Sequence, residues 1–191
     1  MLGMVVPDSG TILFNQKNIA HDWKYRKHIG YMPQIGRYPE NMTIGQVFDM
    51  MKSIRKDESI QLDEELYVEF GLDKLSDKRM QTLSGGTRQK VSACLAFLFN
   101  PDVLILDEPT AGLDPLASEI LKEKINREKE KGKLILITSH ILSELDDLVT
   151  HIIFMQDGKL KFHKPIDALR SETGEIKLSK AIASIMLKTT P

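Results

Sequence analysis

The stretch that most constrains the fold is Val103-Leu104-Ile105-Leu106, four apolar residues followed directly by Asp107 and Glu108. A run that is apolar at every position is typical of a strand buried on both faces of a parallel sheet. Open α/β sheets bind ligands at the carboxyl ends of their strands, where these two carboxylates stand. The run therefore predicts a buried strand that ends in a candidate site.

The segments around this strand predict an α/β fold. Ser84 is placed to N-cap a helix that runs from about Gly85 to Asn100, and Asp114 to N-cap a helix with Pro115 at its first position. The alternation of apolar strands with amphipathic helices predicts a parallel sheet. The other predicted strands are 11–14, 29–32, 134–137 and 152–155, and a hairpin turn at Asp157-Gly158 leads from the last of them into 159–162. Helices are also predicted over 20–29, 141–148 and 175–188, and residues 43–70 carry signals for two helices, the first capped by Thr43 and the second at Asp63–Phe70.

Composition excludes several classes of function. The chain has 191 residues and a formal net charge of -1, which argues against nucleic acid as its main partner because such proteins carry a clear basic excess. Cys94 is the single cysteine, so it has no intrachain disulfide partner, and its setting predicts a small buried helix residue. No run approaches the ~18 apolar residues of a membrane span. Met1–Val6 is too short and uncharged for a signal peptide, so a cytoplasmic location is expected.

A carboxylate pair at the end of a buried strand suits phosphoryl transfer. One carboxylate holds Mg²⁺, usually through water, and the next accepts a proton from the attacking water or orients it. Asp107 fits the first role and Glu108 the second. The alternative for each is a helix cap or a surface salt bridge.

Three other candidates carry weaker signals. Ser84-Gly85-Gly86 stands at a helix N-terminus, where free N–H groups and partial positive charge favour a phosphate, although such turns are common at helix starts. His140 follows an apolar strand and has the reach for a γ-phosphate or the attacking water, but a lone histidine is usually structural. Gln34 begins a loop after Pro33, and by itself it is typical of a solvated loop residue.

Taken together and in order, five segments resemble the motifs of the ATP-binding cassette (ABC) family of transport ATPases. Those motifs are the Q-loop glutamine, the signature, Walker B with the catalytic glutamate, the D-loop and the switch histidine. The matching residues are Gln34, Leu83–Thr87, Val103–Glu108, Ala111–Asp114 and His140. The resemblance covers residues 7–160 and implies a P-loop NTPase-like parallel sheet with an inserted α-helical subdomain.

What the resemblance implies for function is a nucleotide-binding subunit that powers a membrane transporter. Two such subunits pair head to tail, most simply as a homodimer, and hold ATP and Mg²⁺ between the P-loop of one and the signature of the other. Transmembrane permease subunits are the further partners, and they hold the ATPase at the inner face of the cell membrane. The implied catalytic residues are Glu108 and His140, the nucleotide-binding residues Gln34, Ser84, Gly85, Gly86 and Asp114, and the metal ligands Asp107 and Gln34.

The same resemblance divides the chain into four parts. Residues 1–34 are expected to be the remainder of the N-terminal part of the ATPase core, and 35–100 the helical subdomain that ends in the signature helix. Residues 101–160 would hold Walker B, the D-loop and the switch histidine, and 161–191 a C-terminal tail with an amphipathic helix. The Q-loop would couple the γ-phosphate to the contact between the helical subdomain and the membrane subunit.

Two departures from the family pattern stand out. The fifth signature residue is Thr87 rather than the usual glutamine, although Gln89 lies nearby. More seriously, no G-x-x-x-x-G-K-S/T loop occurs in the sequence, and the adenine-stacking aromatic residue that precedes it in the family is also missing. Leu2–Val6 is predicted to be the last turn of the helix that begins at this loop.

The chain therefore resembles a cassette that lacks its first few tens of residues. By analogy, the missing strand would lie between the predicted strands 134–137 and 152–155, and its absence would leave costly unpaired backbone groups. We expect the 191-residue chain alone neither to hydrolyse ATP nor to fold stably.

Two alternatives to this function and one assignment to a subgroup remain to be considered. A non-catalytic interaction module that complements a partner's P-loop in trans shares the fold and differs in having no P-loop of its own. A DNA-repair ATPase would need heptad-patterned coiled-coil insertions, and residues 35–82 hold none. The segment Thr173–Leu178 faintly resembles the tail of export-type cassettes that serve copper-dependent nitrous-oxide reductase maturation, or it belongs to a C-terminal helix packed on its own domain.

Overall fold

The computed structural model describes residues 1–55 and 61–189 and divides the chain into two compact units, Met1–Thr138 and Ser139–Pro191. Each unit is described by itself below. Residues 56–60, which fall within the stretch 43–70 predicted to be helical, lie outside the described residues.

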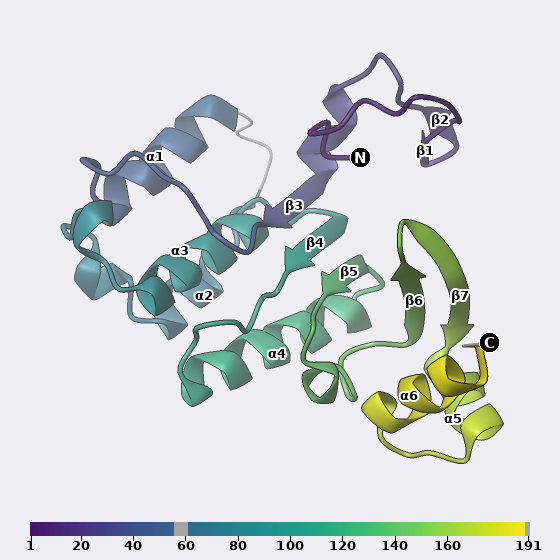
Figure 1. Cartoon of the computed structure of the whole chain (residues 1–191). Coiled ribbons are helices and arrows are strands. Elements are labelled where there is room, and N and C mark those ends of the chain that lie inside the picture. The colour runs from purple at the N-terminus through teal and green to yellow at the C-terminus, as the bar shows by residue number, and fades with distance from the viewer. Residues whose placement is uncertain (56–60, 190–191) are drawn as a thin grey trace. The chain divides into compact units, whose positions relative to one another are not determined.

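The first unit contains a three-stranded parallel sheet in the order β3-β4-β5 (Figure 1). The strands are β3 (Ile29–Met32), β4 (Val103–Asp107) and β5 (Leu134–Thr138). Met32 pairs with Leu106, and Asp107 pairs with Thr138, so the carboxyl ends of all three strands lie at one edge of the sheet. The predicted strands and their parallel arrangement are confirmed.

One face of this sheet is covered by helix α3 (Gly85–Phe97) at β3 and β4. The helix packs against β3, and a Cβ atom at Gly30 would lie 2.0 Å from the carbonyl oxygen of Ala96. Only glycine permits such a close approach of backbone to backbone. Leu104 and Leu106 of β4 are completely buried on this face, whereas Val103 and Ile105 pack in a cluster on the other face. Packing on both faces accounts for the uninterrupted apolar run of the sequence.

The opposite face of the sheet is covered in part. The short hairpin β1 (Leu13–Phe14) and β2 (Lys17–Asn18) and the 3₁₀ helix η1 (Lys24–His28) bring Phe14, Ile19 and Tyr25 against Val103. On β5, in contrast, Leu134 keeps 63% and Leu136 43% of its surface exposed. Among the described residues β5 is also an edge strand, so its outer row of N–H and C=O groups has no strand partner.

The helix that follows β3 begins at a side-chain cap. Thr43 and Gln46 exchange side-chain and backbone hydrogen bonds of 3.2 and 2.9 Å at the start of α1 (Ile44–Arg55), which is a capping box. Cys94 lies buried in α3, as predicted. The other elements are α2 (Glu65–Glu69), η2 (Asp73–Leu75), η3 (Met80–Thr82) and α4 (Pro115–Glu130).

A buried ionic network joins α2 to α4. Lys124 of α4 is 1% exposed, and its ammonium group lies 2.5 Å from the Asp63 carboxylate, 2.7 Å from Glu65 and 3.1 Å from Glu128. Glu128 is completely buried and also pairs with Lys131 and Lys133. Every charge in the network therefore has an opposite partner, as buried charges require.

The network makes stability depend on pH. Burial opposes ionisation of Glu128, but hydrogen bonds from Lys131, Lys133 and Lys124 outweigh it and lower its pKa from 4.5 to about 2. A lowered folded-state pKa stabilises the fold above the unfolded value, and that stability is lost as the pH falls from about 4.5 towards 2. We expect urea unfolding to report a loss of roughly 2–3 kcal/mol from this residue over that window. In the Glu128→Gln variant this part of the pH dependence should be missing.

The second unit is a hairpin with two helices. Strands β6 (His151–Gln156) and β7 (Lys159–Pro165) pair antiparallel through the predicted turn, where Asp157 and Gly158 have positive φ angles of 51° and 70°. Helix α6 (Leu178–Thr189) was predicted, but α5 (Ile166–Thr173), which ends at Gly174 in the left-handed conformation, was not. The helix predicted over 141–148 is reduced to the 3₁₀ turn η4 (Leu142–Glu144).

The prediction of a helical turn at Leu2–Val6 is wrong. These residues form bends without helix, and Val5 and Val6 are 82% and 86% exposed. One turn without a preceding helix makes too few hydrogen bonds to offset the cost of nucleation. None of the described helices is long and apolar enough to cross a membrane.

Candidate nucleotide site

The start of α3 has the geometry of an anion-binding helix N-terminus. Ser84 is the N-cap, and its hydroxyl oxygen accepts a hydrogen bond of 3.2 Å from the Thr87 amide and lies 2.9 Å from the Thr87 hydroxyl. Thr87, which departs from the usual signature, is therefore part of the cap. A Cβ atom at Gly85 would meet nothing within 4 Å, so the approach to the first amides of the helix is open. Such amides and the helix dipole favour a phosphate.

The cap supports a stability prediction. Replacing Ser84 by alanine removes the acceptor for the Thr87 amide, and we expect a loss of about 1 kcal/mol in the free energy of unfolding. Urea denaturation measures it. Ser53→Ala, an exposed position in the last turn of α1, is the matched control and should change stability by less than ~0.5 kcal/mol. Equal effects of the two substitutions would contradict the cap.

The carboxylates of β4 lie at the edge of the sheet where the strands end. The Thr138 hydroxyl of β5 donates a hydrogen bond to the Asp107 carboxylate. Gln34 follows β3 by two residues and is exposed at the same edge. Carboxylate, hydroxyl and amide oxygens are ligands that Mg²⁺ accepts, and Mg²⁺ is commonly held by one or two carboxylates together with substrate phosphates. The donor set at Asp107 and Gln34 fits that ion.

Glu108 has an unusual backbone. Its φ angle is +49°, in the left-handed region that non-glycine residues rarely adopt. Its amide donates to the carbonyl of Thr138 at 3.0 Å, and its carbonyl accepts from the Ala111 amide at 3.1 Å and from the Gln89 side chain at 3.3 Å. These hydrogen bonds fix the backbone from which the carboxylate projects.

The segment after Glu108 reaches α4 through a second cap. One oxygen of the Asp114 carboxylate accepts a hydrogen bond of 2.9 Å from the Ala117 amide, and Pro115 occupies the first turn, as predicted. The other oxygen lies 2.7 Å from the Lys90 ammonium on α3. The hydrogen bond from Lys90 and then that from the amide lower the pKa of Asp114 below its ordinary value. Asp114 therefore ties the D-loop segment to both helices.

The structure thus brings together most of the predicted site within the first unit. Gln34, Asp107 and Glu108 share the edge of one sheet, and the start of α3 lies against the loop that follows Glu108. His140 belongs to the second unit, where it is exposed in the loop before η4. Its role therefore stays a prediction. Sequence reasoning gave no role to Lys90 and noted Gln89 only as a neighbour of Thr87.

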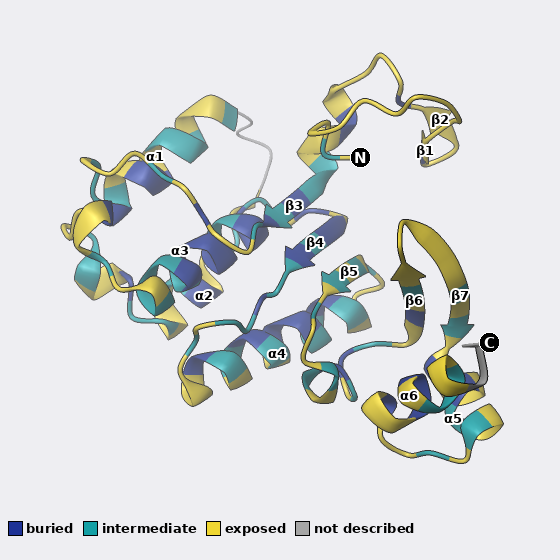
Figure 2. Cartoon of the chain, viewed as in Figure 1, coloured by how far each residue is buried: buried dark blue, intermediate teal, exposed yellow. Residues whose placement is uncertain are grey.

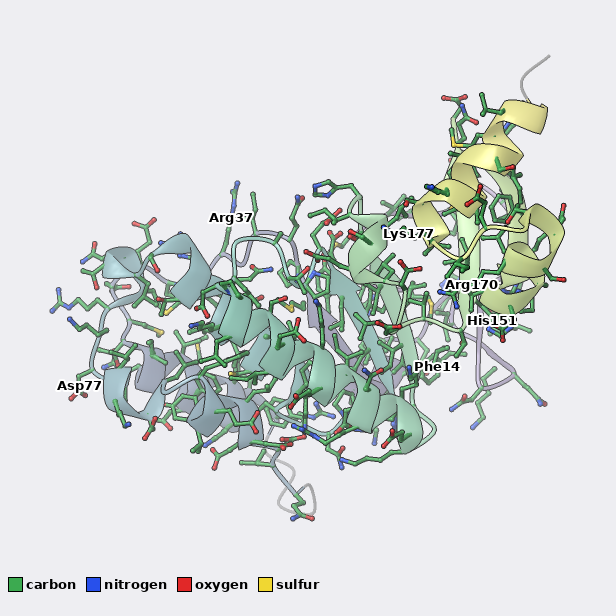
Figure 3. All side chains as sticks on the ribbon, turned by 90° about the horizontal axis from the view of Figure 1, so that it is seen from below. Phe14, Arg37, Asp77, His151, Arg170 and Lys177 are labelled. Carbon is green, nitrogen blue, oxygen red and sulfur yellow. The ribbon has the colours of Figure 1, made fainter. Side chains whose placement is uncertain are left out.

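A pocket of about 380 Å³ adjoins the Q-loop. It is lined by Q-loop and α3 residues of both charge signs together with apolar side chains: Ile35, Gly36, Arg37, Tyr38, Glu40, Met80 and Arg88. The Arg37 side chain is exposed and projects away from the ribbon (Figure 3). The sequence gave no signal for this pocket because its walls lie up to about fifty residues apart in the chain.

Comparison with known proteins decides the family. The family model described as ABC transporter matches residues 1–111, which is more than half of the chain. This chain belongs to the ABC transporter family.

The relatives are longer than this ABC chain. The Nod factor export ATP-binding protein I of Ralstonia nicotianae is 30% identical over 180 residues, which cover 91% of this chain and 56% of the relative. A putative ABC transporter ATP-binding protein of Caldanaerobacter subterraneus subsp. tengcongensis is 31% identical over 168 residues, covering 82% and 69% respectively. The chain thus spans between about half and two thirds of the relatives it matches.

Solved structures agree with the fold of this ABC chain. The ATP-binding subunit of an ABC transporter superposes with a TM-score of 0.86 at 28% identity, covering 97% of this chain and 80% of that one. A dimeric ATP-binding cassette bound to ADP and phosphate has a TM-score of 0.72 at 20% identity, covering 84% of this chain and 75% of that one, and shares the fold. The predicted P-loop NTPase-like fold is confirmed.

Proposed function

We propose that this chain is the ATP-binding and ATP-hydrolysing part of an ABC transporter, and that its activity depends on a P-loop that the 191 residues do not contain. The observation that carries the proposal is the assembly of the signature start, the Walker B carboxylates and the D-loop in one unit. A metal-holding carboxylate, a candidate general base and phosphate-binding amides in one unit are the groups that phosphoryl transfer requires. ATP with Mg²⁺ is the proposed substrate.

Each residue has a role in this proposal. Asp107 and Gln34 hold Mg²⁺, which neutralises phosphate charge when bound. Glu108 orients the attacking water and accepts its proton, and His140 contacts the γ-phosphate. Ser84, Gly85 and Gly86 offer a hydroxyl and amides to the ATP of a second, head-to-tail subunit, and Asp114 holds the D-loop beside them. A homodimer is the simplest such assembly.

Exposed apolar surface in both units supports the dependence on a further segment. In the first unit Leu134 and Leu136 are exposed side chains of β5, which is an edge strand among the described residues. In the second unit Ile153, Met155 and Leu160 of the β6–β7 hairpin are 52%, 62% and 61% exposed (Figure 2). Strands of parallel α/β sheets, such as β5, are normally covered on both faces, and three large apolar side chains on one hairpin are more than a solvated face usually carries. An apolar strand with the helix that follows a P-loop would cover such surface.

Complementation tests the proposal. The chain is co-expressed with a separate segment that carries a strand, a G-x-x-x-x-G-K-S/T loop and the helix that follows this loop. We expect the two to co-purify, the complex to melt at a higher temperature than the chain, and MgATP hydrolysis to appear in the complex alone. A segment whose P-loop lysine is replaced by alanine is the matched control, because it should bind without restoring hydrolysis. Association without ATPase activity would overturn the catalytic roles, and no association would overturn the dependence.

A second candidate is an interaction module that complements a partner cassette in trans. It is favoured by the intact start of α3, where the Ser84 cap and the open Gly85 need no P-loop of this chain. Such a module would restore hydrolysis to a P-loop-bearing cassette with a mutated signature, and this rescue would survive Glu108→Gln. Loss of the rescue in Glu108→Gln would instead favour the enzyme.

The helical subdomain, residues 35–100, is the proposed contact with the permease. In this division of the chain, residues 1–34 and 101–160 form the ATPase core and residues 161–191 form the C-terminal tail. The pocket beside the Q-loop supports this, because its lining includes the exposed Arg37 and the exposed apolar Ile35. Attachment through the permease would place the ATPase at the inner face of the cell membrane. The names of the Nod factor relatives favour an export-type transporter, and the nitrous-oxide reductase subgroup stays a prediction from the tail.

A further inference from the structure

One face of the first two turns of α3 contacts residues 108–114, called the carboxylate loop below, at three points. Gly86, Gln89 and Lys90 are spaced i, i+3 and i+4, so they share that face. A Cβ atom at Gly86 would lie 2.7 Å from the Gly112 carbonyl oxygen. Gln89 donates to the Glu108 carbonyl at 3.3 Å, and Lys90 lies 2.7 Å from the Asp114 carboxylate.

Gln89 stands out among these contacts because it is a buried polar side chain. Only 6% of its surface is exposed, and its amide nitrogen donates a hydrogen bond to the carbonyl of Glu108, the residue in the left-handed conformation. A buried amide that lost this partner would be left unsatisfied, so the contact is maintained. The same carbonyl also closes the turn through Ala111, which makes it the fixed point of the loop from 108 to 114.

We propose that Gln89 is a positioning residue for Glu108, acting through the backbone carbonyl of that residue. With Gly86 and Lys90 it makes the start of α3 and the carboxylate loop one rigid piece. The phosphate-facing end of the signature therefore cannot shift without moving the backbone of Glu108. This proposal rests on the proposed function, because that function gives Glu108 its catalytic role. It deepens the function, because it links the signature residues offered to the ATP of a second subunit to the carboxylate of Glu108 in the same chain.

Two substitutions separate positioning from mere packing. Gln89→Met keeps the shape and removes the N–H donor, while Gln89→His keeps a ring N–H that reaches the same carbonyl. Gln81→Met, at an exposed position in η3, is the matched control. The first measurement is hydrogen exchange of the amides in 108–114 in the 191-residue chain bound to the P-loop segment, compared with those in the second half of α3.

We expect Gln89→Met to speed exchange in 108–114 about tenfold and to leave the second half of α3 unchanged. In the complex with the P-loop segment, the same variant should lower kcat about tenfold with KM for ATP within about twofold of the unsubstituted chain. Gln89→His should restore both, and Gln81→Met should alter neither. Unchanged exchange in Gln89→Met, or a histidine variant as impaired as the methionine one, would overturn the proposal. Should no complex hydrolyse ATP, the proposed function fails, while the exchange comparison still decides for or against Gln89.

Discussion

Replacing Glu108 by glutamine is expected to lower the ATPase rate of the complemented chain about 100- to 10,000-fold. The carboxylate that accepts the proton of the attacking water is lost, while the size of the side chain and the backbone contacts to Thr138, Ala111 and Gln89 remain. Steady-state hydrolysis of MgATP measures the effect. Because the substitution leaves the binding groups in place, KM for ATP should change little.

The control for this prediction is Glu119→Gln on α4. Glu119 is a surface carboxylate that pairs with Lys122, and its side chain is 66% exposed. Its loss should leave the rate within about twofold. A Glu108→Gln variant with the activity of the unsubstituted complex would exclude Glu108 as the catalytic carboxylate and favour the interaction-module candidate.

Replacing Lys124 by methionine is expected to destabilise the chain, in its complex with the P-loop segment, by about 3–5 kcal/mol, the typical cost of removing one partner from a buried ionic network. Asp63, Glu65 and Glu128 would then lie close together without the ammonium group that separates their charges. Urea unfolding followed by circular dichroism measures the change. Since the network joins α2 to α4, we also expect faster hydrogen exchange in α2 than in the unsubstituted chain.

Lys122→Met, two residues away on the same helix, is the matched control. Lys122 forms a surface pair with Glu119, and such pairs contribute about 0–1 kcal/mol. If the two methionine variants unfolded at the same urea concentration, the Lys124 network would not contribute as its burial indicates.

Sequence reasoning succeeded where the physical signal is local. The apolar run at 103–106 is a buried strand, and Ser84 and Asp114 cap the helices that follow them, because strand burial and capping depend on residues within one or two turns. The turn at Asp157-Gly158 was likewise predicted from two residues with a left-handed preference.

Contacts between residues far apart in the chain could not be predicted from the sequence. Lys124 lies 61 residues from Asp63, and Gln89 lies 19 residues from Glu108, so no periodicity or spacing links either pair. A buried lysine on a charged helix also has the appearance of an ordinary surface residue. The helix predicted at Leu2–Val6 is absent for a local reason. A single apolar turn has no stability of its own, because helix nucleation costs more than one turn of hydrogen bonds returns.

Helix α5 was missed although its signals are present. Pro165 precedes it, Ile166 and Leu169 give it a buried side, and Gly174 ends it in the left-handed conformation. Its eight residues are too short for a clear helical period next to the strand that runs directly into it. The contact with β7 and α6, which the sequence does not reveal, supplies most of its stability.

The central claim is that this ABC chain carries the signature and the carboxylates of an ATPase but depends on a P-loop supplied from outside these 191 residues. The most direct measurement is MgATP hydrolysis by the purified 191-residue chain with no added segment, beside its Glu108→Gln variant. We predict no hydrolysis above that of the variant. Turnover by the chain alone that disappears in Glu108→Gln would contradict the claim, because the carboxylate would then act on ATP held without a P-loop.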